Sequence, residues 1–160
     1  MKEVKLETKL TLYDDLSELQ AHDRRLMSKA VEAREKAYAP YSNFTVGAAV
    51  MLDNEVIVTG SNQENASYPS GLCAERVAIF YAGAQYPKAR IKKIAITASA
   101  VNNPTKEPIP PCGSCRQAIA EYEERQGKPI EIFFMGVSGK IARSASLSNL
   151  LPFVFKGSML

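Results

Sequence analysis

Three cysteines are the residues of this sequence best suited to chemistry. Two of them form the motif Cys112-Gly-Ser-Cys115, which follows two prolines. A C-x-x-C motif at the start of a predicted helix suits either a redox-active dithiol or half of a zinc site. The free amides and the dipole of the helix end favour thiolates in both cases. The motif by itself leaves the two chemistries open.

The third cysteine, Cys73, shifts the balance toward zinc. It begins another predicted helix, so all three thiols lie at or near helix N-termini. A catalytic zinc ion has three protein ligands and keeps its fourth position open for water, whereas a structural zinc ion has four protein ligands. Cys73, Cys112 and Cys115 therefore predict an open zinc site. The single histidine, His22, lies far upstream and is assigned no role.

Glu75 follows Cys73 on the first turn of the same predicted helix. An acidic side chain at that position can simply complement the helix dipole. Next to a metal site it can instead lean over the open position without being a ligand. Zinc deaminases combine such a glutamate, acting as general acid and base, with a P-C-x-x-C motif. The sequence therefore predicts that Glu75 is the proton carrier of a hydrolytic active site.

The elements that must position these residues alternate between strands and helices. Apolar spacing predicts a helix from Asp23 to Tyr38, which Asp23 caps and Pro40 ends. Strands are predicted at Val46–Leu52, Glu55–Thr59, Ile91–Ala98 and Ile130–Met135, and further helices at Cys73–Tyr81, Cys112–Glu124 and Leu147–Leu151. The first two strands form an antiparallel hairpin with a two-residue turn at Asp53-Asn54. This order predicts a mixed sheet covered on both faces.

Length and composition describe one domain. The 160 residues are 46% hydrophobic and 23% charged, with a formal net charge of +3. We assign residues 1–160 to a single domain, with residues 1–15 as a candidate N-terminal arm. The N-terminus lacks the apolar core of a signal peptide, and the longest apolar run, Val46–Leu52, is too short to cross a bilayer. We therefore expect a cytoplasmic protein without a membrane partner.

Four sequence blocks resemble the small cytidine deaminases of nucleoside salvage, of the homotetrameric three-cysteine type. The blocks are Tyr41-Ser-Asn-Phe-Thr-Val-Gly-Ala-Ala49, Asn62-Gln-Glu-Asn-Ala-Ser-Tyr68, Cys73-Ala-Glu-Arg76 and Pro111-Cys-Gly-Ser-Cys-Arg-Gln117. The resemblance covers about residues 23–156. Gln63 and Ser114 depart mildly from the family pattern, and the stretch Asn102–Pro110 is longer than in the shortest members. The resemblance implies a three-layer α/β/α cytidine-deaminase fold with a five-stranded mixed sheet.

The resemblance also implies an activity and a cofactor. The expected reaction is the zinc-dependent hydrolysis of cytidine and deoxycytidine to uridine and deoxyuridine plus ammonia, in pyrimidine salvage. One Zn²⁺ per chain would be held by Cys73, Cys112 and Cys115, with Glu75 as the catalytic residue. Three thiolates leave the zinc centre with one net negative charge. The resemblance implies that Arg76 offsets this charge by hydrogen bonding to the ligand sulfurs.

Substrate contacts are likewise implied by the resemblance. Asn62 and Glu64 would bind a ribose hydroxyl, Phe44 would pack against the nucleoside, and the Ala74 backbone would contact the base. Phe155 would close the pocket of a neighbouring subunit, with Phe153 as its rival, which makes the chain a homo-oligomer and, in this family, a tetramer. Tyr41 and Tyr68 can equally be structural or interface residues.

Other classes of function explain less of the sequence. A nucleic-acid deaminase needs a basic groove and aromatic platforms, whereas this chain has no tryptophan and no clustered basic stretch. A thiol-redox protein or a non-enzymatic zinc module would leave Glu75, Asn62 and Glu64 unexplained. The alternative that remains is a deaminase of another small aminopyrimidine nucleoside, such as blasticidin S.

Overall fold

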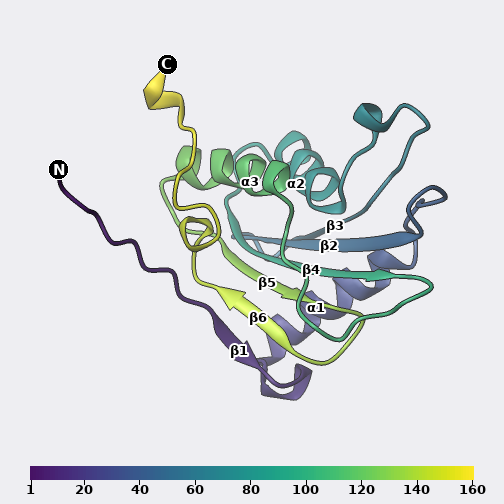
Figure 1. Ribbon diagram of the computed structural model, residues 1–160. Coiled ribbons are helices and arrows are strands. Elements are labelled where there is room, and N and C mark those ends of the chain that lie inside the picture. Colours follow the sequence, from purple (N-terminus) through teal and green to yellow (C-terminus); the bar gives the residue numbers. More distant parts are fainter.

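A mixed β-sheet forms the middle layer of a three-layer α/β/α fold in the computed structural model, which describes residues 1–160 (Figure 1). Its strands are β1 (Thr11–Tyr13), β2 (Phe44–Leu52), β3 (Ile57–Ser61), β4 (Ile91–Ala100), β5 (Glu131–Met135) and β6 (Ile141–Ser144). The six strands lie in the order β1-β6-β5-β4-β2-β3. Only β4 and β5 are parallel neighbours, and all other pairs are antiparallel. The predicted fold class is confirmed, and the sixth strand, β1, comes from the N-terminal arm.

Helices cover both faces of this sheet. Helix α1 (Ala21–Arg34) lies on one face, while α2 (Ala74–Gln85) and α3 (Gly113–Gln126) lie side by side on the other (Figure 1). Short 3₁₀ turns occur at Leu16–Glu18, Tyr68–Ser70, Leu147–Asn149 and Gly157–Met159. None of these helices is both long enough and apolar enough to span a membrane.

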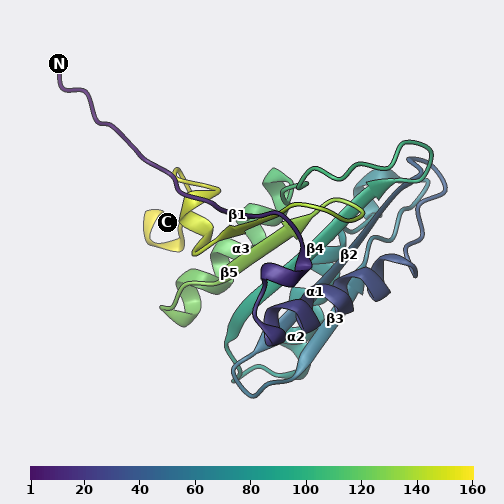
Figure 2. The same ribbon diagram turned by 90° about the horizontal axis from the view of Figure 1, so that it is seen from below.

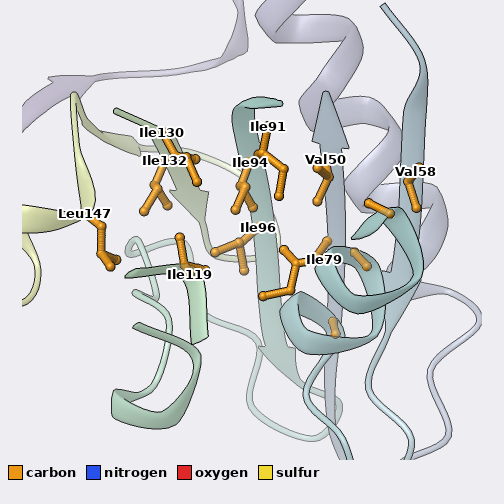
Figure 3. Close-up of a cluster of buried hydrophobic side chains, with 14 of the residues drawn as sticks. Val50, Val58, Ile79, Ile91, Ile94, Ile96, Ile119, Ile130, Ile132 and Leu147 are labelled. Carbon is orange, nitrogen blue, oxygen red and sulfur yellow. The ribbon is translucent and has the colours of Figure 1, made fainter. Parts of the chain in front are cut away.

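Strand β4 shows how the alternation of side chains divides the core. Ile94 and Ile96 point toward α2 and α3, where they join a cluster that includes Ile79 and Ile119 (Figure 3). Ala95, between them, points to the other face and joins a second cluster with Leu26 and other residues of α1. Because successive side chains of a strand point to opposite faces, the consecutive apolar residues Ile94, Ala95 and Ile96 supply both clusters.

Two glycines let the helices approach the sheet closely. A Cβ atom on Gly47 of β2 would lie 2.1 Å from the carbonyl oxygen of Ala30 in α1. A Cβ atom on Gly60 of β3 would lie 2.6 Å from the carbonyl oxygen of Ala74, in the first turn of α2. Only a residue without a side chain allows backbone to pack against backbone at these distances.

The start of the first helix differs from the prediction. Helix α1 begins at Ala21, after the N-cap residue Gln20, and it ends at Arg34. Asp23 is therefore not the cap. Its side chain is buried and accepts a hydrogen bond at 2.7 Å from Lys93 on β4, so a long-range ion pair takes the place of a local capping interaction.

Two other predicted elements differ from the structure. The predicted two-residue hairpin turn is wrong, because residues 53–56 connect β2 to β3, with Glu55 in the left-handed region at φ 65°. The residues from Leu147 form a 3₁₀ turn rather than a longer helix. Strand β6, which follows the turn at Ser138-Gly139, was not predicted from the pattern.

Candidate active site

The N-termini of α2 and α3 bring the three cysteines together. Cys73 and Cys112 are the N-cap residues of α2 and α3, and neither thiol caps its own helix. Cys115 lies in the first turn of α3. The three Sγ atoms all lie within 4.8 Å of one another, and those of Cys73 and Cys112 are 3.9 Å apart. A tetrahedral zinc ion with bonds of about 2.3 Å holds its sulfur ligands roughly 3.8 Å apart, so this cluster fits zinc.

The surroundings of the cluster favour a thiolate. A hydrogen bond from Cys115 and the nearby Arg76 guanidinium lower the pKa of Cys73 to about 5. Arg76 Nη2 donates to Cys73 Sγ at 3.8 Å, and this contact raises the pKa of Arg76. The hydrogen bond with Cys73 and the burial of Cys115 raise the pKa of the Cys115 thiol. The cluster therefore carries the negative charge that a divalent cation requires, together with a positively charged neighbour.

Glu75 is buried beside the thiols with an unsatisfied carboxylate oxygen. Glu75 is only 4% exposed, and its Oε2 atom has no hydrogen-bond partner. Burial raises the pKa of Glu75. Buried polar atoms without a partner are rare in folded proteins, because each one loses its bonds to water without replacing them. This oxygen is therefore available to a ligand or to a proton in transfer.

A cavity of about 710 Å³ opens in front of this cluster. Small-molecule sites in proteins typically have volumes of roughly 300–1,000 Å³. The cavity is lined by Tyr41, Ser42, Phe44, Val46, Asn62, Gln63, Glu64, Asn65, Tyr68, Gly71, Leu72, Cys73, Glu75, Arg76, Ile96, Ala98, Ile109, Pro110 and Cys112. It therefore places apolar walls, polar side chains, thiols and a buried carboxylate around one space of a size that suits a nucleoside.

Most of the residues singled out from the sequence meet at this cavity. The lining includes Phe44, Asn62, Glu64, Cys73, Glu75, Arg76 and Cys112. Ala74 and Cys115 are fully buried behind the lining. Phe155 is not part of the lining and is 59% exposed on the C-terminal tail. Phe153 is exposed on the same tail, and Tyr41 and Tyr68 form a tilted aromatic pair with ring centroids 6.0 Å apart.

Asn62 holds the start of β2 in place. Its Oδ1 accepts a hydrogen bond from the Val46 amide at 2.8 Å, and its Nδ2 donates to the Phe44 carbonyl at 2.9 Å. A side-chain amide has two donor hydrogens and two acceptor lone pairs, so one of each remains for a ligand. Asn62 thus fixes the backbone on either side of Thr45 and still presents polar capacity to the cavity.

Glu64 anchors the loop that leads into β2. Its Oε2 accepts hydrogen bonds from the backbone amides of Tyr41 and Ser42 at 2.9 and 3.2 Å, and its Oε1 accepts one from the Ser42 hydroxyl. The hydroxyl of Ser42, followed by the Tyr41 amide, lowers the pKa of Glu64. The carboxylate therefore stays ionised near neutral pH and shapes this rim of the cavity.

The segment before α2 is aligned by backbone pairing. Gln63 and Leu72 exchange two backbone hydrogen bonds of 2.9 Å, which brings the chain back beside β3 just before Cys73. This pairing sets the position at which α2 begins. Gln63, noted above as a mild departure from the family pattern, also contributes to the lining of the cavity.

Sequence reasoning missed several residues around the site. Ile109 and Pro110 line the cavity from the loop before α3, although the sequence shows only that prolines precede Cys112. Arg116 Nε donates to the Pro111 carbonyl at 2.8 Å, and its Nη1 donates to the Leu150 carbonyl at 3.0 Å. No local pattern indicates the contact with Leu150, because the fold alone brings these two residues together.

Comparisons with known proteins match both the sequence and the fold. The family model described as the cytidine and deoxycytidylate deaminase zinc-binding region matches residues 20–127. A cytidine deaminase of Halalkalibacterium halodurans is 42% identical over 134 residues, which cover 83% of this chain and 94% of that protein. A cytidine deaminase of Sporosarcina psychrophila is 36% identical over 131 residues, or 82% of this chain and 89% of that protein.

A solved structure has the same fold over most of this chain. The crystal structure of a cytidine deaminase from Burkholderia pseudomallei matches with a TM-score of 0.71 and 40% sequence identity, covering 86% of this chain and all of that chain. The matched region of the family model contains the three clustered cysteines and Glu75. The chain therefore belongs to the cytidine and deoxycytidylate deaminase family.

Proposed function

We propose that this protein is a zinc-dependent cytidine deaminase that hydrolyses cytidine and deoxycytidine to uridine and deoxyuridine with release of ammonia. Its membership of the cytidine and deoxycytidylate deaminase family supports this activity. The observation that carries the proposal is the cluster of three thiols beside the buried, unpaired oxygen of Glu75 in one nucleoside-sized cavity. A purely structural zinc site would have no use for such a carboxylate at the wall of a cavity.

Cys73, Cys112 and Cys115 would hold one zinc ion per chain. When bound, the zinc ion would lower the pKa of a water molecule to about 7. Glu75 takes a proton from the water that attacks C4 of the pyrimidine, and delivers it to N3. Glu75 then takes the proton of the hydroxyl group added at C4 and passes it to the amino group, which leaves as ammonia while the C4 carbonyl forms. Overall, one water molecule is consumed and one ammonia molecule is released, and the C4 amino group is replaced by a carbonyl oxygen.

Arg76 would offset the charge of the thiolates. Three thiolates and one divalent zinc ion carry a net charge of −1, which weakens the cation as a Lewis acid. The guanidinium contact to Cys73 at 3.8 Å withdraws electron density from that sulfur. We infer that Arg76 is a positioning and charge-balancing residue rather than a ligand.

The nucleoside would be bound by the rim of the cavity. Asn62 and Glu64 keep free hydrogen-bonding capacity for ribose hydroxyls, and Phe44 offers a ring for packing against the nucleoside. The Ala74 backbone lies between Cys73 and Glu75, where it would contact the edge of the base. We also propose that residues 1–160 form one domain that acts in cytoplasmic pyrimidine salvage, where a reducing environment keeps the thiols free for metal.

Two variants separate the proton carrier from the metal ligands. We expect Glu75→Gln to keep its zinc and its fold while losing about 10²–10⁴-fold in kcat for cytidine, as removal of a general acid and base does. Cys112→Ala should lose zinc together with activity. Elemental analysis, circular dichroism and an ultraviolet assay of cytidine deamination measure the three properties. Near-normal turnover by Glu75→Gln would remove Glu75 from the mechanism.

A substrate panel tests the choice of nucleoside. Cytidine, deoxycytidine, blasticidin S, CMP and a cytosine-containing oligonucleotide would be compared at equal concentration by release of ammonia. We expect turnover of the two free nucleosides only. Preferred turnover of blasticidin S, with cytidine inert, would keep the zinc chemistry but overturn the proposed substrate.

The site would be completed by a neighbouring subunit of a homotetramer. Phe155 is exposed and lies outside the lining of its own chain's cavity, which supports a role for it at a neighbour's cavity. Phe155→Ala should raise KM for cytidine and leave the zinc content unchanged. Mixed oligomers of Glu75→Gln chains and Phe155→Ala chains should be more active than either parent. An activity equal to the average of the parents, with exchange confirmed by mass, would refute a shared site.

A further inference from the structure

The N-terminal arm has the sequence of an amphipathic strand that is much longer than β1. Apolar side chains or threonine occupy every even position from Val4 to Leu12, while the odd positions 3, 5, 7 and 9 are Glu, Lys, Glu and Lys and position 11 is Thr. Strict alternation of this kind is the signature of a strand with one apolar face. Only Thr11–Tyr13 of the arm pairs with the sheet, as β1.

The rest of the arm is extended, and its one hydrogen bond with the body of the chain runs from the Lys9 amide to Asn149 Oδ1 at 3.2 Å. Residues 1–10 are exposed and lead away from the body of the molecule in both views (Figures 1 and 2). Lys5 Nζ lies 2.9 Å from Glu7 Oε1, so these two side chains point to the same side, as in a strand. The apolar side chains of Val4, Leu6, Leu10 and Leu12 are all exposed, and Leu10, the least exposed residue of the four, is still 48% exposed.

We propose that the arm pairs with the arm of a second copy of this chain, as an antiparallel two-stranded ribbon whose two-fold axis passes between the two Thr8 residues. Strand β1 is the last strand of the sheet and pairs only with β6, so its outer edge is free to accept another strand. Exposed strand edges are ready templates for such pairing. The six-stranded sheets of the two copies would become continuous across the ribbon. The arm precedes residue 20, where the family match begins.

The apolar face selects this register. With Thr8 opposite its own copy, Leu6 faces Leu10 and Val4 faces Leu12, so each apolar side chain has an apolar partner. A shift of one residue would turn the apolar face of one arm against the charged face of the other. A shift that centres the ribbon on Leu6 would instead place Lys2 opposite Leu10.

The charged face excludes the registers that are centred on a charged residue. With Thr8 at the centre, Glu7 of each arm faces Lys9 of the other, and no like charges are opposed. Centring the ribbon on Glu7 would oppose two glutamates and pair Lys5 with Lys9, and centring it on Lys9 would oppose two lysines. Opposite charges across a strand pair stabilise it and like charges destabilise it. The alternating charges therefore make the arm complementary to itself only when an even-numbered residue lies at the centre, and the apolar face then favours Thr8 over Leu6.

Disulfide trapping tests both the partner and the register. Thr8→Cys, Leu6→Cys and Val4→Cys would be made separately in the zinc-loaded full chain and equilibrated in a buffer of reduced and oxidised glutathione. Residues directly opposite in a strand pair are close enough for a disulfide, whereas the two introduced thiols would be separated by about 14 Å at position 6 and by about 27 Å at position 4. We expect covalent dimers of Thr8→Cys at a level several-fold above those of the other two variants, and none from the unaltered chain. Equal or absent crosslinking at all three positions, or a maximum at position 6, would overturn the proposal.

Charge exchange gives a second, independent measurement. In the Thr8→Cys chain, Glu7→Lys or Lys9→Glu alone would oppose like charges and lower the crosslinked fraction roughly tenfold, since two cross-strand pairs change sign. A mixture of the two variants restores both opposite-charge pairs, so crosslinked heterodimers should return to the original level. Crosslinking that ignores these charges would contradict the ribbon. Because the cavity is not altered, a failure here would leave the deaminase activity and the proposed role of Phe155 untouched.

Discussion

Gly60→Ala would change the active site without touching any residue of the cavity lining. Gly60 lies on β3, beneath the first turn of α2. Its added Cβ would be 2.6 Å from the Ala74 carbonyl oxygen and 2.7 Å from the Ala78 amide nitrogen. Both atoms belong to the backbone of α2 and cannot rotate away, so the helix itself must move. Because Cys73 and Glu75 flank Ala74, the displacement reaches the proposed proton carrier and one thiol.

The geometry gives the size of the effect. The contact with Ala74 falls about 0.8 Å short of the 3.4 Å at which ordinary contacts begin. Overpacking of this kind costs about 1–3 kcal/mol of unfolding free energy, or roughly 2–12 °C in Tm for a chain of this size. A displacement of about 1 Å in a catalytic group lowers the rate by roughly 100-fold. We therefore expect Gly60→Ala to lose about 10–100-fold in kcat/KM at a temperature where it is fully folded.

Gly47→Ala is the matched comparison. Its Cβ would lie 2.1 Å from the Ala30 carbonyl oxygen, so the clash is stronger, but it displaces α1 on the opposite face of the sheet. Thermal unfolding, zinc analysis and steady-state kinetics well below Tm would be measured for both variants, with Gly157→Ala as a control that meets no atom within 4 Å. Gly47→Ala should lose more stability than Gly60→Ala and far less kcat/KM. Equal losses of activity, or an unaltered Gly60→Ala enzyme, would refute the argument that the β3–α2 contact positions the site.

Two further predictions concern the rim of the cavity. Asn62→Ala leaves the Val46 amide and the Phe44 carbonyl without their partner, so we expect a loss of about 1–3 kcal/mol in urea unfolding and a higher KM for cytidine; an unchanged KM would show that the start of β2 does not shape the cavity. The pKa of Glu64 is held below its ordinary value of 4.5 by the Ser42 hydroxyl and the Tyr41 amide, so its contribution to stability is complete above that value and is lost as the pH falls through the lowered pKa. Glu64→Gln should therefore flatten the acidic part of the stability profile measured by thermal unfolding, and a profile identical to that of the unaltered chain would contradict this role.

The sequence was sufficient for features that depend on local pattern and on residue type. The helices predicted at Cys73–Tyr81 and Cys112–Glu124 are α2 and α3, which begin within one residue of the predicted positions and continue to Gln85 and Gln126. The prediction that the three thiols lie together also required the premise that three ligands without a fourth form an open metal site. The cluster with Sγ atoms within 4.8 Å of one another agrees with that premise.

Features decided by distant partners could not be predicted. Asp23 has the residue type and position of a helix cap, but its carboxylate is used by Lys93, seventy residues further along the chain. Strand β6 has only four residues, too few for a distinct alternation, and it forms where β5 provides a partner; β1 in turn pairs with β6. The polar side chains of Asn62 and Glu64 were predicted to face substrate, and nothing local showed that they also hold residues 41–46 in place.

The two residues after Cys115 connect the thiol cluster to the C-terminal tail. Arg116 uses its guanidinium fork to join the carbonyl of Pro111, immediately before Cys112, to that of Leu150. Gln117 forms two hydrogen bonds with the backbone of Phe155, at 2.8 and 3.3 Å. The N-terminal part of α3 therefore carries the Cys115 thiol. Its side chains also bind the loop before Cys112 and the segment that contains Phe155. A single helix end can in this way set both the position of the thiol cluster and the direction in which the C-terminal tail leaves α3.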